Sequence, residues 1–158
     1  MVHTHSSNGM GPDAKRHASF ELRSACEAFC TAMRGSARSA PMISLHDFPS
    51  GACGDASLLL ARYLADSGLG TTEYVSGWWG DQGHAWLELD GLIIDVTASQ
   101  FDPELPEAFV SSDRTWHLRF TDLERRPSDF ESYDARTASE FGRVYEWLLV
   151  VLARRSTL

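Results

Sequence analysis

The sequence predicts an α+β fold, in which helices and antiparallel strands occupy separate parts of the chain. Two helical patterns of apolar residues come first, strand-like stretches fill the middle, and a long amphipathic helical pattern closes the chain. The dipeptide Asp90-Gly91 lies between two apolar-rich stretches, which is the signal of a two-residue β-hairpin. Strands that follow one another without intervening helices are typical of α+β domains.

Length and composition limit the classes of partner. The chain has 158 residues, which suggests one domain with a sizeable core. Its formal net charge is -8 and no basic stripe is visible, so we expect no nucleic-acid partner. The longest apolar run, Trp147–Ala153, is too short to cross a bilayer, so we expect no membrane partner. The polar N-terminus lacks the apolar region of a signal peptide, and a cytoplasmic location is expected.

The periodicity of apolar residues places the secondary structure. Residues 1–18 are rich in small and polar residues, so we expect a disordered tail there and a single domain over 19–158. Helices are expected at about 20–34, 53–66 and 135–154, and strands at 72–79, on both sides of Asp90-Gly91 and at 116–120. The stretches 102–113 and 124–133 have the composition of loops.

The hairpin around Asp90-Gly91 carries the first sign of chemistry. If these two residues form the loop, Leu89 pairs with Leu92 and side chains alternate between two faces. One face is then wholly apolar: Ala85, Leu87, Leu89, Leu92, Ile94 and Val96. The other face brings His84 and Asp95 together as diagonal neighbours, with Cα atoms roughly 7–8 Å apart. The apolar face needs a cover, which the helix from Phe20 or the C-terminal helix could supply.

Cys53 is the candidate nucleophile for this His–Asp pair. It lies at the start of the helix that contains Leu58-Leu59-Leu60, where the helix dipole and free N–H groups favour a thiolate. Flanking glycines leave room for a substrate, and the amide N–H of Cys53 could face an oxyanion. His84 would then act as general base and acid, and Asp95 would orient the imidazole.

The order Cys53, His84, Asp95 resembles the transglutaminase-like superfamily of papain-type cysteine enzymes over roughly residues 50–101. The motifs that carry the resemblance read Gly51-Ala-Cys53-Gly-Asp at a helix start, His84-Ala-Trp86-Leu-Glu88 on a strand, and Asp95-Val-Thr97 on the next strand. The third motif departs from the Asp-Pro-Thr of that superfamily at Val96.

The resemblance implies a papain/transglutaminase-like core, in which the nucleophile helix packs on an antiparallel sheet with N- and C-terminal helices around it. It also implies a thiol-dependent hydrolase or acyltransferase, which attacks an amide or acyl carbonyl through a Cys53 thioester and needs no metal or organic cofactor. The substrate would be a peptide, a protein or a small amide or acyl compound.

Five further residues are candidates for substrate binding or oxyanion stabilisation, namely Gly54, Trp78, Trp79, Trp86 and Gln100. Trp78 and Trp79 are adjacent and face opposite sides of a strand, so one is expected in the core and one in the cleft. Trp86 is expected to pack against the Cys53 helix or to contact substrate.

Three other residues with potential chemistry are expected to be structural. Cys26 and Cys30 share one helix face and are expected in the core. His117 is expected to be a structural histidine on a short strand.

Two other functions fit the same sequence. A protein glutamine deamidase or transglutaminase-type enzyme, acting as an effector or in biosynthesis, would keep the site and change the acceptor. A non-catalytic peptide-binding module would keep only the fold.

Overall fold

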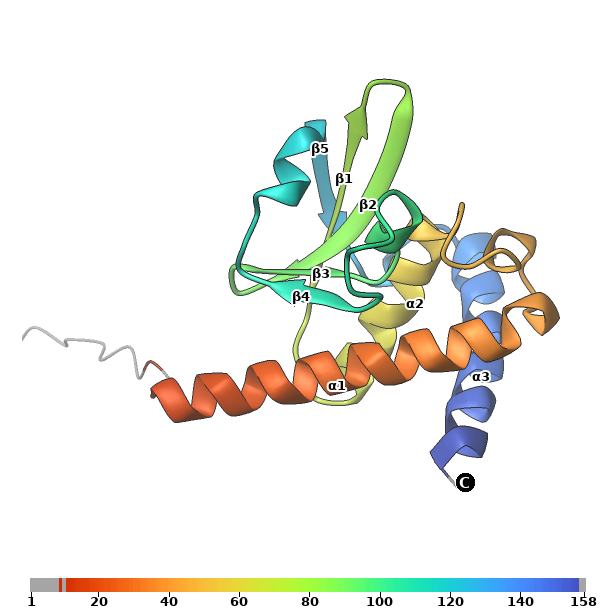
Figure 1. Ribbon diagram of the computed structural model, residues 1–158. Coiled ribbons are helices and arrows are strands. Elements are labelled where there is room, and N and C mark those ends of the chain that lie inside the picture. The colour runs from red at the N-terminus through yellow and green to blue at the C-terminus, as the bar shows by residue number, and fades with distance from the viewer. Residues whose placement is uncertain (1–8, 10, 157–158) are drawn as a thin grey trace, which may run out of the picture.

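Three α-helices and a five-stranded sheet form within the part of the chain that the structure describes, Gly9 and residues 11–156 (Figure 1). In this computed structural model the helices are α1 (Pro12–Ser36), α2 (Cys53–Asp66) and α3 (Ala135–Ser156). The strands are β1 (Glu73–Trp79), β2 (Gln82–Leu89), β3 (Leu92–Asp95), β4 (Phe109–Ser111) and β5 (Thr121–Pro127). They form an antiparallel sheet in the order β4-β3-β2-β1-β5, which confirms the α+β class. Among the described residues, no helix has the length and apolar character needed to span a bilayer.

The β2–β3 hairpin has the register that the sequence predicts. Asp90 and Gly91 both have positive φ values, 49° and 80°, as a two-residue type I′ loop requires. Leu89 therefore pairs with Leu92, and Leu87 pairs with Ile94. Since this parity is fixed at the turn, all apolar residues of one face enter the core together.

The apolar face of the hairpin packs on α2. Leu87, Ile94 and Val96 belong to the main core, which also contains buried residues from all three helices. The helix that contacts β2 is α2, as expected for the helix that begins at Cys53, and α1 and α3, which could also have covered this face, pack around it. Four residues of α2 that face this core, Ala56, Leu59, Leu60 and Leu64, are completely buried.

A second, mostly aromatic cluster buries the opposite face of the sheet. It consists of Val75, Trp86, Ile93, Phe109 and Phe120, with Phe101, Leu105 and Trp116 at its margin. The margin residues come from the chain between β3 and β5, which folds back over the sheet. His84 and Asp95 lie on this face, so both are buried rather than exposed to solvent.

Helix α1 is longer than the apolar pattern predicts. It begins at Pro12, a favourable first helical residue, and Asp13 follows in its first turn. Most side chains before Leu22 are exposed, so this first part has no apolar stripe that could have been recognised in the sequence. Residues 12–18, which we expected in the tail, are therefore helical, and residues 1–8 and 10 lie outside the described residues.

The chain after β4 also differs from the prediction. Residues 116–120 were expected to form a strand, but Trp116–Arg119 is a 3-10 turn, η4. The whole stretch 124–133 is expected to be loop, but its first four residues belong to strand β5. Every residue of β5 is exposed, so the apolar alternation that reveals a half-buried strand is absent. Its charged residues and terminal Pro127 are typical of an edge strand.

Candidate active site

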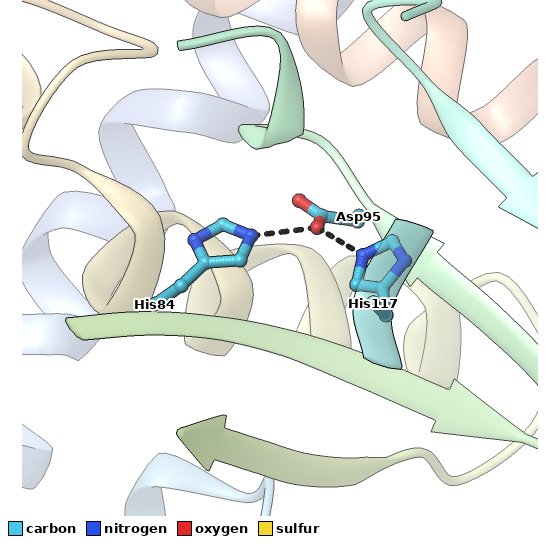
Figure 2. A group of neighbouring side chains, drawn as sticks. All are labelled: His84, Asp95 and His117. Carbon is cyan, nitrogen blue, oxygen red and sulfur yellow. Dashed lines mark hydrogen bonds and ion pairs between the residues drawn. The ribbon is translucent and has the colours of Figure 1, made fainter. Parts of the chain in front are cut away.

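Asp95 is the centre of a buried polar cluster on the aromatic side of the sheet. Its Oδ2 atom accepts a hydrogen bond from Nε2 of His84 at 2.7 Å, as Figure 2 shows. Its Oδ1 atom accepts the backbone N–H of Thr97 at 3.0 Å. The side chains of His84 and Asp95 have no exposed surface. The hairpin register therefore brings this pair into direct contact, as the alternation of side chains predicts.

A second histidine binds the same carboxylate oxygen. Nε2 of His117, from η4, lies 2.7 Å from Oδ2 of Asp95 (Figure 2). We expected His117 to be structural, and its contact with Asp95 was not apparent from the sequence. The two residues are 22 positions apart and no hairpin relates them, so neither spacing nor periodicity could have indicated the contact. The only sequence feature that could have indicated a buried histidine here is its position between Trp116 and Leu118, close to other aromatic residues.

Aromatic rings enclose His84. The ring centroids of Phe101 and Phe120 lie 5.0 Å and 5.1 Å from its imidazole, and that of Trp86 lies at 5.6 Å. This enclosure keeps water away from the contact between His84 and Asp95. A charged pair in such a low-dielectric setting interacts more strongly than one in water.

The opposite charges of His84 and Asp95 determine the protonation states of both side chains. Burial opposes the charged form of His84, but the adjacent Asp95 carboxylate and the nearby Cys53 side chain outweigh burial and raise the pKa of His84 to about 9. Burial likewise opposes ionisation of Asp95, but His84 and the hydrogen bond from His117 hold the pKa of Asp95 well below its usual range. At neutral pH, His84 is therefore an imidazolium and Asp95 a carboxylate.

Cys53 is the first residue of α2 and lies beside His84. It is half-buried, and both residues line one cavity of about 400 Å³. Because Nε2 of His84 is bonded to Asp95, only Nδ1 is left for the thiol. Nδ1 is buried and has no hydrogen-bond partner among the described residues, yet Cys53 is close enough to affect the pKa of His84. Catalytic hydrogen bonds are often long in a free enzyme and shorten when substrate binds.

Strands β1 and β5 supply most of the other residues that line the cavity. The residues that line it include Tyr74, Ser76, Trp78, Asp122, Glu124 and Arg126. Trp78 is 53% exposed and lines the cavity, as one of the two adjacent tryptophans was expected to do. Trp79 is 44% exposed and packs edge-on against Phe120, so it is not the core residue that we expected.

Two of the remaining candidates lie near the start of α2. The side-chain carbonyl of Gln100 accepts the backbone N–H of Gly51, two residues before Cys53, at 3.2 Å. Its amide nitrogen is buried without a partner among the described residues, so one donor near the loop before α2 is unused. Gly54 follows Cys53, and a Cβ at this position would lie 3.0 Å from the hydroxyl of Tyr74. Gly54 therefore lets α2 approach β1 closely.

Trp86 does not line the cavity. It is 1% exposed and belongs to the aromatic cluster, where it contacts the ring of His84. Trp86 does not pack against α2 as expected, because α2 covers the other face of the sheet.

The other two cysteines are expected to react slowly, because they are buried. Cys26 and Cys30 are buried in the main core, as expected, and burial raises the pKa of both thiols, that of Cys30 to about 12. The alkylation rate of Cys53 can therefore be compared with those of Cys26 and Cys30 in the same protein.

A cavity of about 460 Å³ near the end of α1 contains another histidine, His46. Nε2 of His46 is bonded to the carbonyl of Ala40, and no cysteine lines this cavity. The Cys53 cavity is therefore the better candidate for an active site.

His84, Asp95 and His117 could also be considered as metal ligands, since their ligand atoms lie within 4.8 Å of one another. Two observations disfavour this reading. Each Nε2 lies 2.7 Å from Oδ2, closer than the roughly 3.3 Å between ligand atoms around a tetrahedral zinc ion. A metal-bound histidine usually donates its other N–H to a partner, whereas both Nδ1 atoms here lack one among the described residues. Direct hydrogen bonds explain the cluster.

Comparison with known proteins gave no match to a protein-family model, to a curated protein or to a solved structure.

Proposed function

We propose that this protein is a cysteine-nucleophile hydrolase or acyltransferase with a papain/transglutaminase-like core. The observation that carries the proposal is that Cys53 and His84 line one cavity, while Asp95 binds His84 from behind it. Helix α2 supplies Cys53 at its N-terminus, β2 supplies His84, and β3 supplies Asp95. His84 binds Asp95 through one ring nitrogen and has the other free beside the thiol. This is the arrangement that nucleophile, general acid–base and orienting residues need.

In the proposed reaction, the Cys53 thiolate attacks the carbonyl carbon of an amide and forms a tetrahedral oxyanion. The imidazolium of His84 gives its Nδ1 proton to the leaving nitrogen as the C–N bond breaks, which leaves a thioester and a neutral imidazole. Water or an amine then attacks the thioester and gives its proton back to Nδ1. The C–S bond breaks and restores the ion pair, and Asp95 holds the Nε2–H bond throughout.

The raised pKa of His84 supports the order of these steps. An imidazole that is already protonated at neutral pH acts first as an acid toward the leaving group and stabilises an adjacent thiolate. Free N–H groups at the start of α2 are suited to the developing oxyanion. The substrate would be a peptide, a protein or a small amide or acyl compound.

Alkylation with iodoacetamide near neutral pH tests this proposal. We expect Cys53 to react much faster than Cys26 and Cys30 in the same folded protein, as resolved by peptide mass spectrometry. His84→Ala should slow the reaction of Cys53, whereas His17→Ala, which removes an exposed histidine of α1, should not. Equally slow alkylation of all three cysteines would favour a non-catalytic peptide-binding module.

Intact mass spectrometry with a panel of peptide amides then separates the reactions. A thioester on Cys53 adds the mass of the acyl group to the protein. Hydrolysis of a peptide bond, conversion of glutamine to glutamate and transfer to an added amine each change the substrate mass by a different amount. Deamidation or transfer would identify the glutamine-modifying alternative.

A further inference from the structure

His117 is a buried histidine that has no part in the steps proposed above. His117 is 4% exposed. Its imidazole is packed among aromatic rings, and its centroid lies 5.0 Å from that of Phe109, 5.0 Å from that of Trp86 and 4.8 Å from that of Trp116. A polar ring in such a setting is costly unless it makes a hydrogen bond. Within the described part of the chain, the bond from Nε2 to Asp95 is its one hydrogen bond, because Nδ1 has no partner. The aromatic packing therefore aims His117 at Asp95.

This contact completes the hydrogen bonding of the Asp95 carboxylate. Oδ1 accepts the backbone N–H and the hydroxyl of Thr97, and Oδ2 accepts the N–H groups of both histidines. The terminal torsion of an aspartate is soft, so each additional donor that binds the carboxylate limits its rotation further. His117 approaches Oδ2 from η4, whereas His84 approaches it from β2, so the two donors hold this oxygen between them (Figure 2).

We propose that His117 is a positioning residue of the active site, which fixes Asp95 so that the carboxylate in turn aims Nδ1 of His84 at Cys53. The inference rests on the proposed function, since it assigns His117 a role in the reactivity of Cys53. His117 does not line the cavity, so it acts through Asp95 and His84 and not on substrate. The working unit is then Cys53, His84, Asp95 and His117, supplied by four different elements.

The charged and titratable groups that face Asp95 come from three elements. They are His84 on β2, His117 on η4 and Cys30 on α1, whose thiol is affected by the Asp95 charge. Burial raises the pKa of Cys30 to about 12, so this thiol stays neutral over the range of the experiment. The other group that raises the pKa of His84 is Cys53, which every His117 variant keeps unchanged. A change in the titration of His84 after substitution of His117 therefore reports on the Asp95 carboxylate.

His117→Phe and His117→Gln separate positioning from packing. Phe keeps an aromatic ring and removes the donor, whereas the Gln amide reaches about as far as Nε2 and keeps a donor. We expect His117→Phe to slow the alkylation of Cys53 near neutral pH by about tenfold or more, the factor that one lost hydrogen bond to a charged group represents. His117→Gln should restore most of the rate, and His17→Gln on the surface should leave it unchanged.

Titration of His84 by NMR supplies a readout that a purely structural role would not move. If His117 positions the carboxylate, the pKa of His84 should fall from about 9 toward its ordinary value in His117→Phe and recover in His117→Gln. A rise in His117→Phe would overturn the proposal, because His117 would then compete with His84 for Asp95. Thermal unfolding verifies that the variants fold, and His117→Met replaces the Phe variant if that one does not.

The two proposals fail in different ways. If Cys53 of the wild-type protein is no more reactive than Cys26 and Cys30, the proposed function is wrong. If wild-type Cys53 is reactive but folded His117→Phe, or its Met replacement, keeps the wild-type rate and the wild-type titration of His84, only the role of His117 is wrong. A Gln variant as slow as the Phe variant would show that the donor is not the feature that matters.

Discussion

Replacing Asp95 with Asn should be strongly destabilising, because it removes the one negative charge in the buried cluster without changing its shape. The NH₂ group of Asn would face either the two histidine N–H groups or the N–H of Thr97, so donor would meet donor. The pKa of His84 lies at about 9 against an ordinary 6.5, and each pKa unit corresponds to about 1.4 kcal/mol. The charged pair therefore contributes about 3 kcal/mol, in line with the roughly 3–5 kcal/mol lost when one partner of a buried pair is removed.

The dependence of this loss on pH follows from the two pKa changes. The pKa of Asp95 is lowered by folding, so its contribution is present above the ordinary carboxyl pKa of about 4 and is lost as the pH falls further. The pKa of His84 is raised by folding, so its contribution is complete below about pH 6.5 and is lost as the pH rises through about 9. The difference between wild type and Asp95→Asn should thus be largest between about pH 4 and 6.5.

Urea unfolding at a series of pH values measures this difference. Asp81→Asn is the matched control, since it removes an equal charge from the exposed β1–β2 turn and should change stability by less than about 0.5 kcal/mol. The reasoning is refuted if Asp95→Asn is as mild as the control. It is also refuted if the loss has the same size at about pH 6 and above about pH 9.

Two further predictions concern the fold that holds the site. Leu59→Ala, at a completely buried position of α2, should lower the free energy of unfolding by about 2–5 kcal/mol. Leu149→Ala, on the exposed surface of α3, should lower it much less. Similar losses for the two variants in urea unfolding would contradict the assignment of the core. Gly91→Ala should lower the free energy of unfolding by about 1–2 kcal/mol, because φ is positive at this position. Gly142→Ala, at a helical position with open space around it, should raise the free energy of unfolding by about 0.5–1 kcal/mol. Equal changes in melting temperature for the two glycine variants would show that the hairpin loop is not constrained.

The hairpin could be predicted because its information is local. Asp90-Gly91 fixes the loop length, and the strict alternation on each side fixes which face each residue occupies. The contact between His84 and Asp95 follows from that parity alone. The place of Cys53 at the start of a buried helix was equally local, since it depends on the apolar pattern that begins a few residues later.

The rest of the site depends on contacts between distant segments. His117 reaches Asp95 because the chain between β3 and β5 folds over the sheet, and nothing in the order of residues gives that path. Strand β5 has no buried face, so its pairing with β1 leaves no periodic signal, although it contributes Asp122, Glu124 and Arg126 to the cavity wall. The face of the sheet on which Trp86 lies could be predicted from the alternation of side chains. The aromatic cluster that covers this face could not be predicted, because its residues come from distant parts of the chain.

The location of the candidate site reflects burial on both faces of the sheet. Cys53 belongs to the helix that packs in the main core, whereas His84 is held by rings of the aromatic cluster on the other face. The proposed nucleophile and its proposed acid–base partner thus lie on segments that pack in different cores, and both line the cavity where α2 begins beside β2. A rigid helix and a fully enclosed imidazole can keep the two groups in register without a direct covalent or metal link. Cys53 and His84 line the cavity and Asp95 does not, so in the proposed reaction a substrate carbonyl can approach Cys53 while Asp95 stays out of contact with water.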